Sequence, residues 1–131
     1  MKPITKEWLD LAMDDLDACE QLLRKIHLTN LASFHAQQAV EKSFKAVIEE
    51  FQTAFVKTHN LVRLYELVEP HGVEISDSDM LGRLDQLYTD SRYPSDMGLL
   101  PYGKPTKEDA RAFYDFAVTV YRQIKNKLEA L

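Results

Sequence analysis

Cysteine is almost missing from this sequence, since Cys19 is the single one among 131 residues. One cysteine forms no internal disulfide and supplies no cysteine-based zinc site. No run of apolar residues exceeds three, which argues against a membrane-spanning helix and against a secretory signal. Basic residues are outnumbered, with 16 Lys and Arg against 21 Asp and Glu, and the formal charge of −5 argues against a basic face for duplex DNA. We therefore expect a cytoplasmic protein with no membrane contact.

Glycine and proline are also scarce, with four and five residues, and most of them lie in Tyr93–Pro105. That segment is expected to be a loop, because proline removes a backbone donor and glycine permits positive φ. Apolar residues elsewhere recur at helical spacing, and no stretch shows the alternation of a strand. The expected helices run near Ile4–Lys25, Asn30–Gln52, Thr58 to before Pro70, Ser76–Arg92 and Thr106–Leu131. We predict one all-α domain over residues 1–131, an up-and-down antiparallel bundle of four to five helices.

The core-facing side of the two first helices follows from the same spacing. In the first helix the apolar stripe extends from Trp8 to Ile26, and in the second it extends from Ala32 through Ala36 to Phe51. Small residues early in the second stripe favour a close helix contact.

Asp15 breaks the apolar stripe of the first helix. A buried carboxylate needs partners, because burying it alone is costly. Three interpretations remain open: an acid tilted into solvent, a ligand-binding group, or a structural partner of a cation. Lys42, Lys45 and Arg92 are the cations that we expect to pair with it.

A polar strip lies on the second helix, where His35, Gln38, Lys42 and Lys45 share one side. Such a strip is either a solvated face or the wall of a groove for a phosphate or a base edge.

Two further positions complete the candidate site. Thr58 is the expected N-cap of the third helix, which would place His59 in its first turn, as a capping histidine or as a ligand contact. Tyr88 and Arg92 share a face of the fourth helix with Asp85, and Arg92 is either a helix-capping residue or a phosphate-binding residue. We predict that these groups line one nucleotide-binding groove: His35, Gln38, Lys42, Lys45, His59, Tyr88 and Arg92.

Five segments in this order resemble the HEPN domain family: Ala12–Leu16, Phe34–Ala46, Thr58–Leu61, Leu84–Pro94 and Thr106–Ala110. The resemblance covers nearly the whole chain. It implies a helical bundle, often a homodimer, that associates with a minimal nucleotidyltransferase partner. Leu31 and Phe34, together with Tyr93, Leu99, Leu100 and Tyr102, are apolar candidates for the dimer interface.

Many HEPN proteins are metal-independent ribonucleases whose active site is Arg-x4–6-His. Arg24 precedes His27 by only two intervening residues, Arg63 precedes His71 by seven, and no histidine follows Arg92. The motif is therefore absent, and with it the expected acid or base for attack by a 2′-hydroxyl group.

Other catalytic and metal-binding patterns are missing as well. The sequence has no Glu-x-x-His, no His-Glu-x-x-His, no P-loop and no Gly-x-Gly-x-x-Gly. We expect no catalytic residue, no metal site and no cofactor. The leading hypothesis is a HEPN module that binds a nucleotide or a nucleotidyltransferase partner without catalysis. The alternative is a divergent RNA endonuclease, the toxin of a toxin–antitoxin pair, and a third possibility is a structural dimer without a ligand.

Overall fold

The structure is a computed structural model that describes residues 1–52, 56–91 and 104–131, with the backbone alone at 89–91. All regular elements in these ranges are helical. The α-helices are α1 (Pro3–Leu22), α2 (Thr29–Phe51), α3 (Leu61–Val68), α4 (Asp79–Ser91) and α6 (Lys107–Glu129). Two short 3-10 helices, η1 (Ile26–Leu28) and η2 (Glu69–His71), connect neighbouring elements. The predicted all-α bundle is confirmed.

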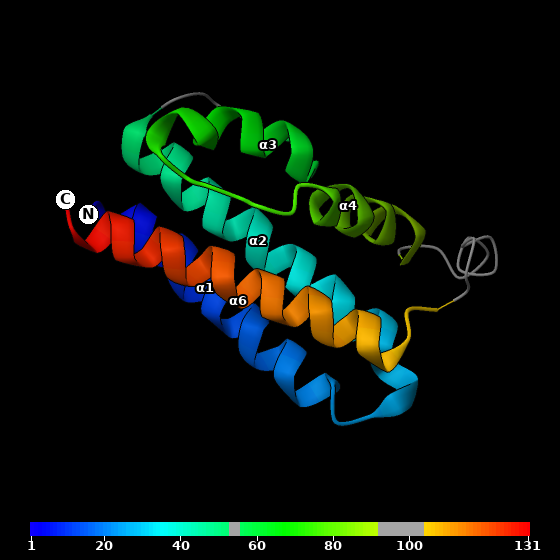
Figure 1. The fold of residues 1–131 in the computed structure, drawn as a ribbon. Coiled ribbons are helices and arrows are strands. Elements are labelled where there is room, and N and C mark those ends of the chain that lie inside the picture. Colours follow the sequence, from blue (N-terminus) through cyan, green and yellow to red (C-terminus); the bar gives the residue numbers. More distant parts are fainter. Residues whose placement is uncertain (53–55, 92–103) are drawn as a thin grey trace.

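Helix α2 is the centre of the bundle, because it contacts every other α-helix of the described chain. Helices α1 and α6 lie along one side of it, and α3 and α4 lie along the other side (Figure 1). The two chain termini lie at the same end (Figure 1). A polar residue on α2 therefore meets either the layer of α1 and α6 or the layer of α3 and α4, depending on the face that carries it.

Small residues on α2 allow this close packing. Ala32, Ala36 and Ala39 are all fully buried, as the apolar spacing predicts. Helix α6 begins at a capping box, in which Thr106 accepts a bond from the backbone N–H of Asp109 and Asp109 accepts one from the backbone N–H of Thr106. The predicted start of this helix is therefore confirmed.

The start of the third helix is different from the prediction. Asn60, not Thr58, is the N-cap of α3, and its side chain accepts a bond from the N–H of Arg63. Thr58 instead accepts a bond from the N–H of Asn60 through its hydroxyl oxygen. His59 consequently lies before the helix and not in its first turn, so the interpretation of His59 as a first-turn capping residue is wrong.

Three further predictions of the sequence fail at helix ends. Ile26 is 77% exposed, because α1 ends at Leu22 and Ile26 belongs to η1. Phe51 is partly exposed at the last position of α2, where its ring stacks on His71. Helix α4 begins at Asp79 and not at the expected Ser76, because a bend at Ser76 and a turn at Ser78 precede it.

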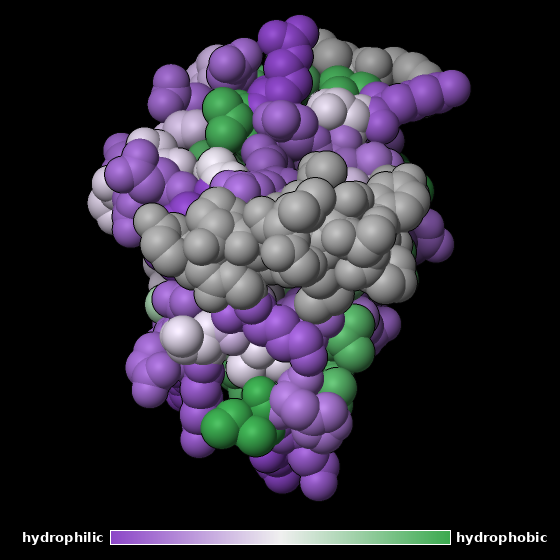
Figure 2. Space-filling model, turned by 90° about the vertical axis from the view of Figure 1, so that its right-hand side faces the viewer, coloured by the Kyte–Doolittle hydropathy of each residue, from purple (hydrophilic) through white to green (hydrophobic). Residues whose placement is uncertain are grey.

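The surface at one end of the bundle is mostly hydrophilic. In Figure 2 hydrophobic groups form separate patches among hydrophilic side chains. Within the described ranges, none of the helices is both long and apolar enough to cross a membrane.

Candidate functional site

Asp15 forms a buried ion pair between α1 and α2. Its side chain is 10% exposed, and it accepts a bond from Lys42 Nζ at 2.6 Å and faces His35 Nδ1 at 2.9 Å. The predicted partnership of Asp15 with a lysine is confirmed, and the interpretation of Asp15 as a solvated acid is wrong. Two members of the polar strip, His35 and Lys42, are thus held against α1.

Glu41 forms a second buried centre on the other side of α2. The residue is 3% exposed. Its carboxylate lies 2.9 Å from Lys45 Nζ and 3.0 Å from His59 Nδ1. Glu41 was not predicted as a site residue, although its spacing of four residues from Lys45 is a signal for an ion pair. Such pairs also form on solvated helix faces, so the spacing does not reveal burial.

Gln37 fixes the backbone beside this second centre. Its side chain is fully buried, and Nε2 donates to the carbonyl oxygen of His59 at 3.2 Å. Gln38, a member of the polar strip, donates to Gln37 Oε1 at 2.7 Å. The segment that carries His59 is therefore attached to α2 through both its side chain and its backbone.

Asp85 joins α4 to the beginning of α3. Its two carboxylate oxygens accept bonds from the backbone N–H groups of Leu61 at 2.7 Å and Val62 at 3.2 Å. These donors belong to the first turn of α3 and have no partner within that helix. Burial raises the pKa of Asp85, while the two N–H bonds act in the opposite direction.

Four aromatic rings form a continuous row beside these groups. His59 stacks on Tyr88 with ring centres 5.2 Å apart, and Tyr88 stacks on Phe34 at 5.8 Å. Phe34 in turn contacts the ring of His35 edge to face at 5.8 Å. The row runs from the Glu41 centre to the Asp15 centre.

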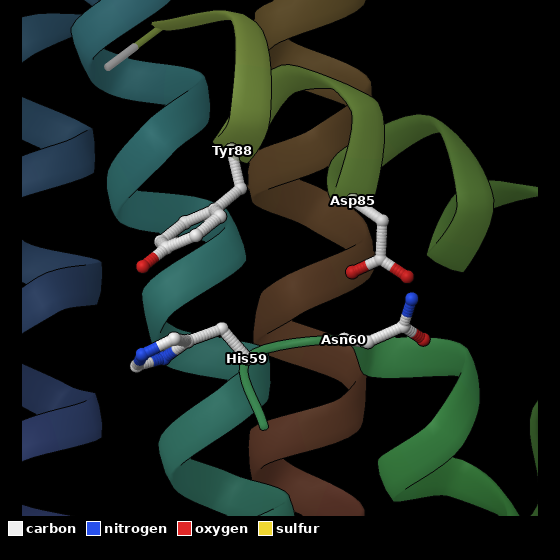
Figure 3. A pocket seen from close by; sticks show the side chains of 4 residues that line it. All are labelled: His59, Asn60, Asp85 and Tyr88. Carbon is white, nitrogen blue, oxygen red and sulfur yellow. The ribbon is translucent and has the colours of Figure 1, made fainter. Parts of the chain in front are cut away.

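A pocket opens at the His59 end of this row. Its volume is about 210 Å³, and it is lined by His59, Asn60, Asp85 and Tyr88. Asp85 and Tyr88 extend from α4, while His59 and Asn60 come from the segment that enters α3 (Figure 3). The side chains from the two elements face one another across the pocket (Figure 3).

The bond to Glu41 determines which ring nitrogen of His59 carries the proton. Because a carboxylate accepts hydrogen bonds, the neutral His59 ring carries its proton on Nδ1, which donates to Glu41. The second ring nitrogen, Nε2, is then an acceptor. A histidine held in this way by a buried carboxylate is a hydrogen-bond acceptor for a ligand or a candidate general base.

The structure brings most of the predicted site residues into this region. His35 and Lys42 meet at Asp15, Lys45 and His59 meet at Glu41, and Tyr88 lies on the ring of His59. Arg92 lies outside the described residues. Asn60 and Asp85 line the pocket although they were not predicted as site residues. No group of three or more metal-ligating side chains occurs in residues 1–52, 56–91 and 104–131.

The fold and the site define a small helical bundle of the all-α class, with buried ion pairs on both flanks of its central helix. The HEPN domain family matches residues 5–127, so the chain belongs to this family. Two solved structures are similar over almost their whole length. TT1696 from Thermus thermophilus is 23% identical with a TM-score of 0.74, covering 94% of this chain and 97% of that one, and it shows the shared fold.

The second similar structure is ST0689, described as an archaeal HEPN homologue. It is 26% identical with a TM-score of 0.68, and the match covers 97% of this chain and 98% of that one. No curated protein matches the chain.

Proposed function

We propose that this protein is a nucleotide-binding HEPN module that performs no chemistry alone, and that the pocket at His59 and Tyr88 holds the base. The observation that carries the proposal is the stacked pair of rings beside a carboxylate and an amide. Aromatic faces bind bases by stacking, and carboxylate and amide groups recognise base edges.

The volume of the pocket supports a base and not a whole nucleotide. Sites for drug-sized ligands usually measure about 300–1,000 Å³, and this pocket measures about 210 Å³. The ribose and phosphate of a bound nucleotide would therefore lie outside it, toward the polar strip.

The lysines of the polar strip support phosphate binding less than their spacing in the sequence suggested. Lys42 forms an ion pair with Asp15, and Lys45 forms one with Glu41, so each cation already has an anionic partner inside the protein. A phosphate would have to compete with these carboxylates. The ring pair, more than the lysines, supports the nucleotide-binding role, and the contact of Arg92 with phosphate remains part of the proposal.

Calorimetric titration with nucleoside monophosphates tests this function. We expect saturable binding to the wild-type protein and a loss of at least about fivefold in affinity for Tyr88→Ala, since stacking contributes about 1–3 kcal/mol per base. Tyr114→Ala is the matched control, because Tyr114 lies on α6, outside the pocket residues. No heat at millimolar nucleotide with folded protein would refute the proposal.

A divergent RNA endonuclease is the second candidate, and the pairing of His59 with Glu41 favours it. This pair supplies the candidate general base that the missing Arg-x4–6-His motif does not. An RNA cleavage assay separates the two functions. RNA cleavage by the wild-type protein that disappears in His59→Ala would favour the endonuclease, the toxin role included. Equal background cleavage by the wild-type protein and by His59→Ala would favour the binding module.

A homodimer and a nucleotidyltransferase partner complete the proposal. Leu31, at the start of α2, is 44% exposed, and exposed apolar side chains are common at interfaces. Tyr93, Leu99, Leu100 and Tyr102 lie outside the described residues. Light scattering should give twice the monomer mass of 15.1 kDa, and the monomer mass at micromolar concentration would refute the dimer. Co-purification with the product of an adjacent nucleotidyltransferase gene tests the partner.

A further inference from the structure

We propose that His59 is a phosphoryl acceptor, and that its ring nitrogen Nε2 takes a phosphoryl group from a small acyl phosphate. The proposal concerns a covalent modification of this chain and does not rest on the nucleotide-binding function. It follows from the accessibility of the ring, from the hydrogen bond that fixes it, and from the charges around it.

The His59 ring is accessible at Nε2. Its side chain is 49% exposed, and the residue lies in the segment before α3, outside any helix. Within residues 1–52, 56–91 and 104–131, the ring has two polar or ring contacts, which are the bond from Nδ1 to Glu41 and the stack on Tyr88. The first uses the other nitrogen and the second uses the ring face, so the in-plane lone pair of Nε2 is free to attack phosphorus.

The hydrogen bond to Glu41 prepares Nε2 for this attack. Nδ1 lies 3.0 Å from Glu41 Oε2 and 3.1 Å from Oε1, so the neutral ring carries its proton on Nδ1 and its lone pair on Nε2. Attack by Nε2 makes the ring positively charged. The buried carboxylate of Glu41 stabilises that charge as it forms, as a buried aspartate does for the histidine of serine proteases.

Lys45 balances the charge of Glu41 beside the ring. Its Nζ is 2.9 Å from Glu41 Oε2, the same oxygen that faces His59 Nδ1. An anionic donor therefore approaches an ion pair without net charge and not an isolated carboxylate. Asp85, the other acid of the pocket, lies on the opposite side of the pocket from the His59 ring in Figure 3. The surroundings of His59 thus permit the approach of a phosphoryl group.

The position of the ring proton indicates the class of donor. Because the Nδ1 proton is bound to Glu41, His59 has no proton to give to a leaving group. An acyl phosphate needs none, since its leaving group is a stable carboxylate. In the transfer, Nε2 forms a bond to phosphorus, the bond between phosphorus and the acyl oxygen breaks, and the carboxylate leaves with the electron pair. The ring keeps its proton on Nδ1, in the bond to Glu41.

A nucleoside triphosphate fits this position less well as a donor. Its phosphates need cations around them during transfer, and Lys42 and Lys45 are both already paired with carboxylates. The sequence also has no P-loop. A small acyl phosphate is therefore the donor class that the site favours.

Acetyl phosphate is the probe, and the four histidines of the chain are compared in one sample. The full chain is incubated at neutral pH, phosphohistidine is preserved in alkali, and peptide mass spectrometry gives the labelling rate at each position. His27 is the matched control, because it is exposed and its ring has no carboxylate partner among the described residues. We expect His59 to react at least about tenfold faster than His27, since tenfold corresponds to about 1.4 kcal/mol and a hydrogen bond to a charged group contributes that much.

Glu41→Gln tests the part that the carboxylate plays. It keeps an acceptor for the Nδ1 proton but removes the negative charge, so we expect labelling of His59 to fall to the rate of His27. Glu49→Gln changes an exposed glutamate of the same helix and should leave labelling of His59 as in the wild type. Thermal unfolding shows whether each variant is folded. If Glu41→Gln is unfolded, the comparison of His59 with His27 in the wild-type protein decides.

Four results would overturn the inference. Absence of label at His59, or labelling no faster than at His27, would refute the prepared acceptor. Faster labelling of His35, which faces Asp15 but has a side chain only 32% exposed, would refute the assignment to His59. Label from ATP with Mg²⁺ and none from acetyl phosphate would refute the class of donor. None of these results bears on nucleotide binding, which the calorimetric titration tests separately.

Discussion

Replacing Glu41 by alanine should destabilise the protein far more than replacing another glutamate of the same helix. Glu41 is 3% exposed, and its carboxylate holds Lys45 and His59. Removing one partner of a buried ion pair typically costs about 3–5 kcal/mol, because the other charge stays buried without a counter-ion. The side chain of Lys45 is 15% exposed and that of His59 is 49% exposed. Both can therefore regain some hydration, which lowers the expected loss to about 2–3 kcal/mol.

Urea unfolding measures this loss through the free energy of unfolding extrapolated to water. Glu49→Ala is the matched control, because Glu49 lies on α2 with an exposed side chain, and surface substitutions usually change stability by no more than about 0.5 kcal/mol. Glu41→Gln should fall between the two, since it keeps an acceptor but removes the charge. Equal free energies of unfolding for Glu41→Ala and Glu49→Ala would refute the role of Glu41 as a buried anchor.

Three other predictions use the same unfolding assay. Asp15→Ala should lower the free energy of unfolding more than Asp14→Ala, because Asp15 is paired and buried whereas Asp14 is exposed; equal effects would contradict the buried pair. Ala36→Leu should cost about 1–3 kcal/mol by overpacking the fully buried surface of α2, while Ala112→Leu on the exposed side of α6 should cost little; a tolerated Ala36→Leu would contradict the close packing. Burial raises the pKa of Asp85 above its ordinary value of 3.8, so ionising this group opposes folding, and its contribution to stability should fall as pH rises from about 4 through the raised pKa. Asp85→Asn should remove this part of the pH profile of stability, and an unchanged profile would contradict the raised pKa.

The fold could be predicted from the sequence because its signals are local. Apolar spacing places Ala36 in the core, and the Thr106–Asp109 capping box marks the start of α6. Both depend on residues within a few positions of each other along one helix. The end of α1 could not be predicted in this way, because the apolar spacing continues to Ile26 after the helix has stopped at Leu22.

The candidate site could be predicted only in part, because its contacts join distant segments. The spacing on α2 indicates that Lys42 and Lys45 share a side, but it does not show that they contact different carboxylates. The sequence around Asp85 indicates only an acidic residue on an amphipathic helix. Its bonds to the first turn of α3 join it to a segment far away in sequence, because Leu61 precedes Asp85 by 24 residues. Such a contact becomes visible once the two helices are placed in space.

Nucleotide binding at the pocket is tested most directly by detecting contact between a bound base and the rings of His59 and Tyr88. Intermolecular nuclear Overhauser effects can be measured between a saturating nucleoside monophosphate and the 13C-labelled protein. We expect cross-peaks from the base protons to the ring protons of His59 and Tyr88, the two rings that stack in the pocket. Cross-peaks confined to residues outside this pocket, or none from a nucleotide that is shown to bind, would contradict it.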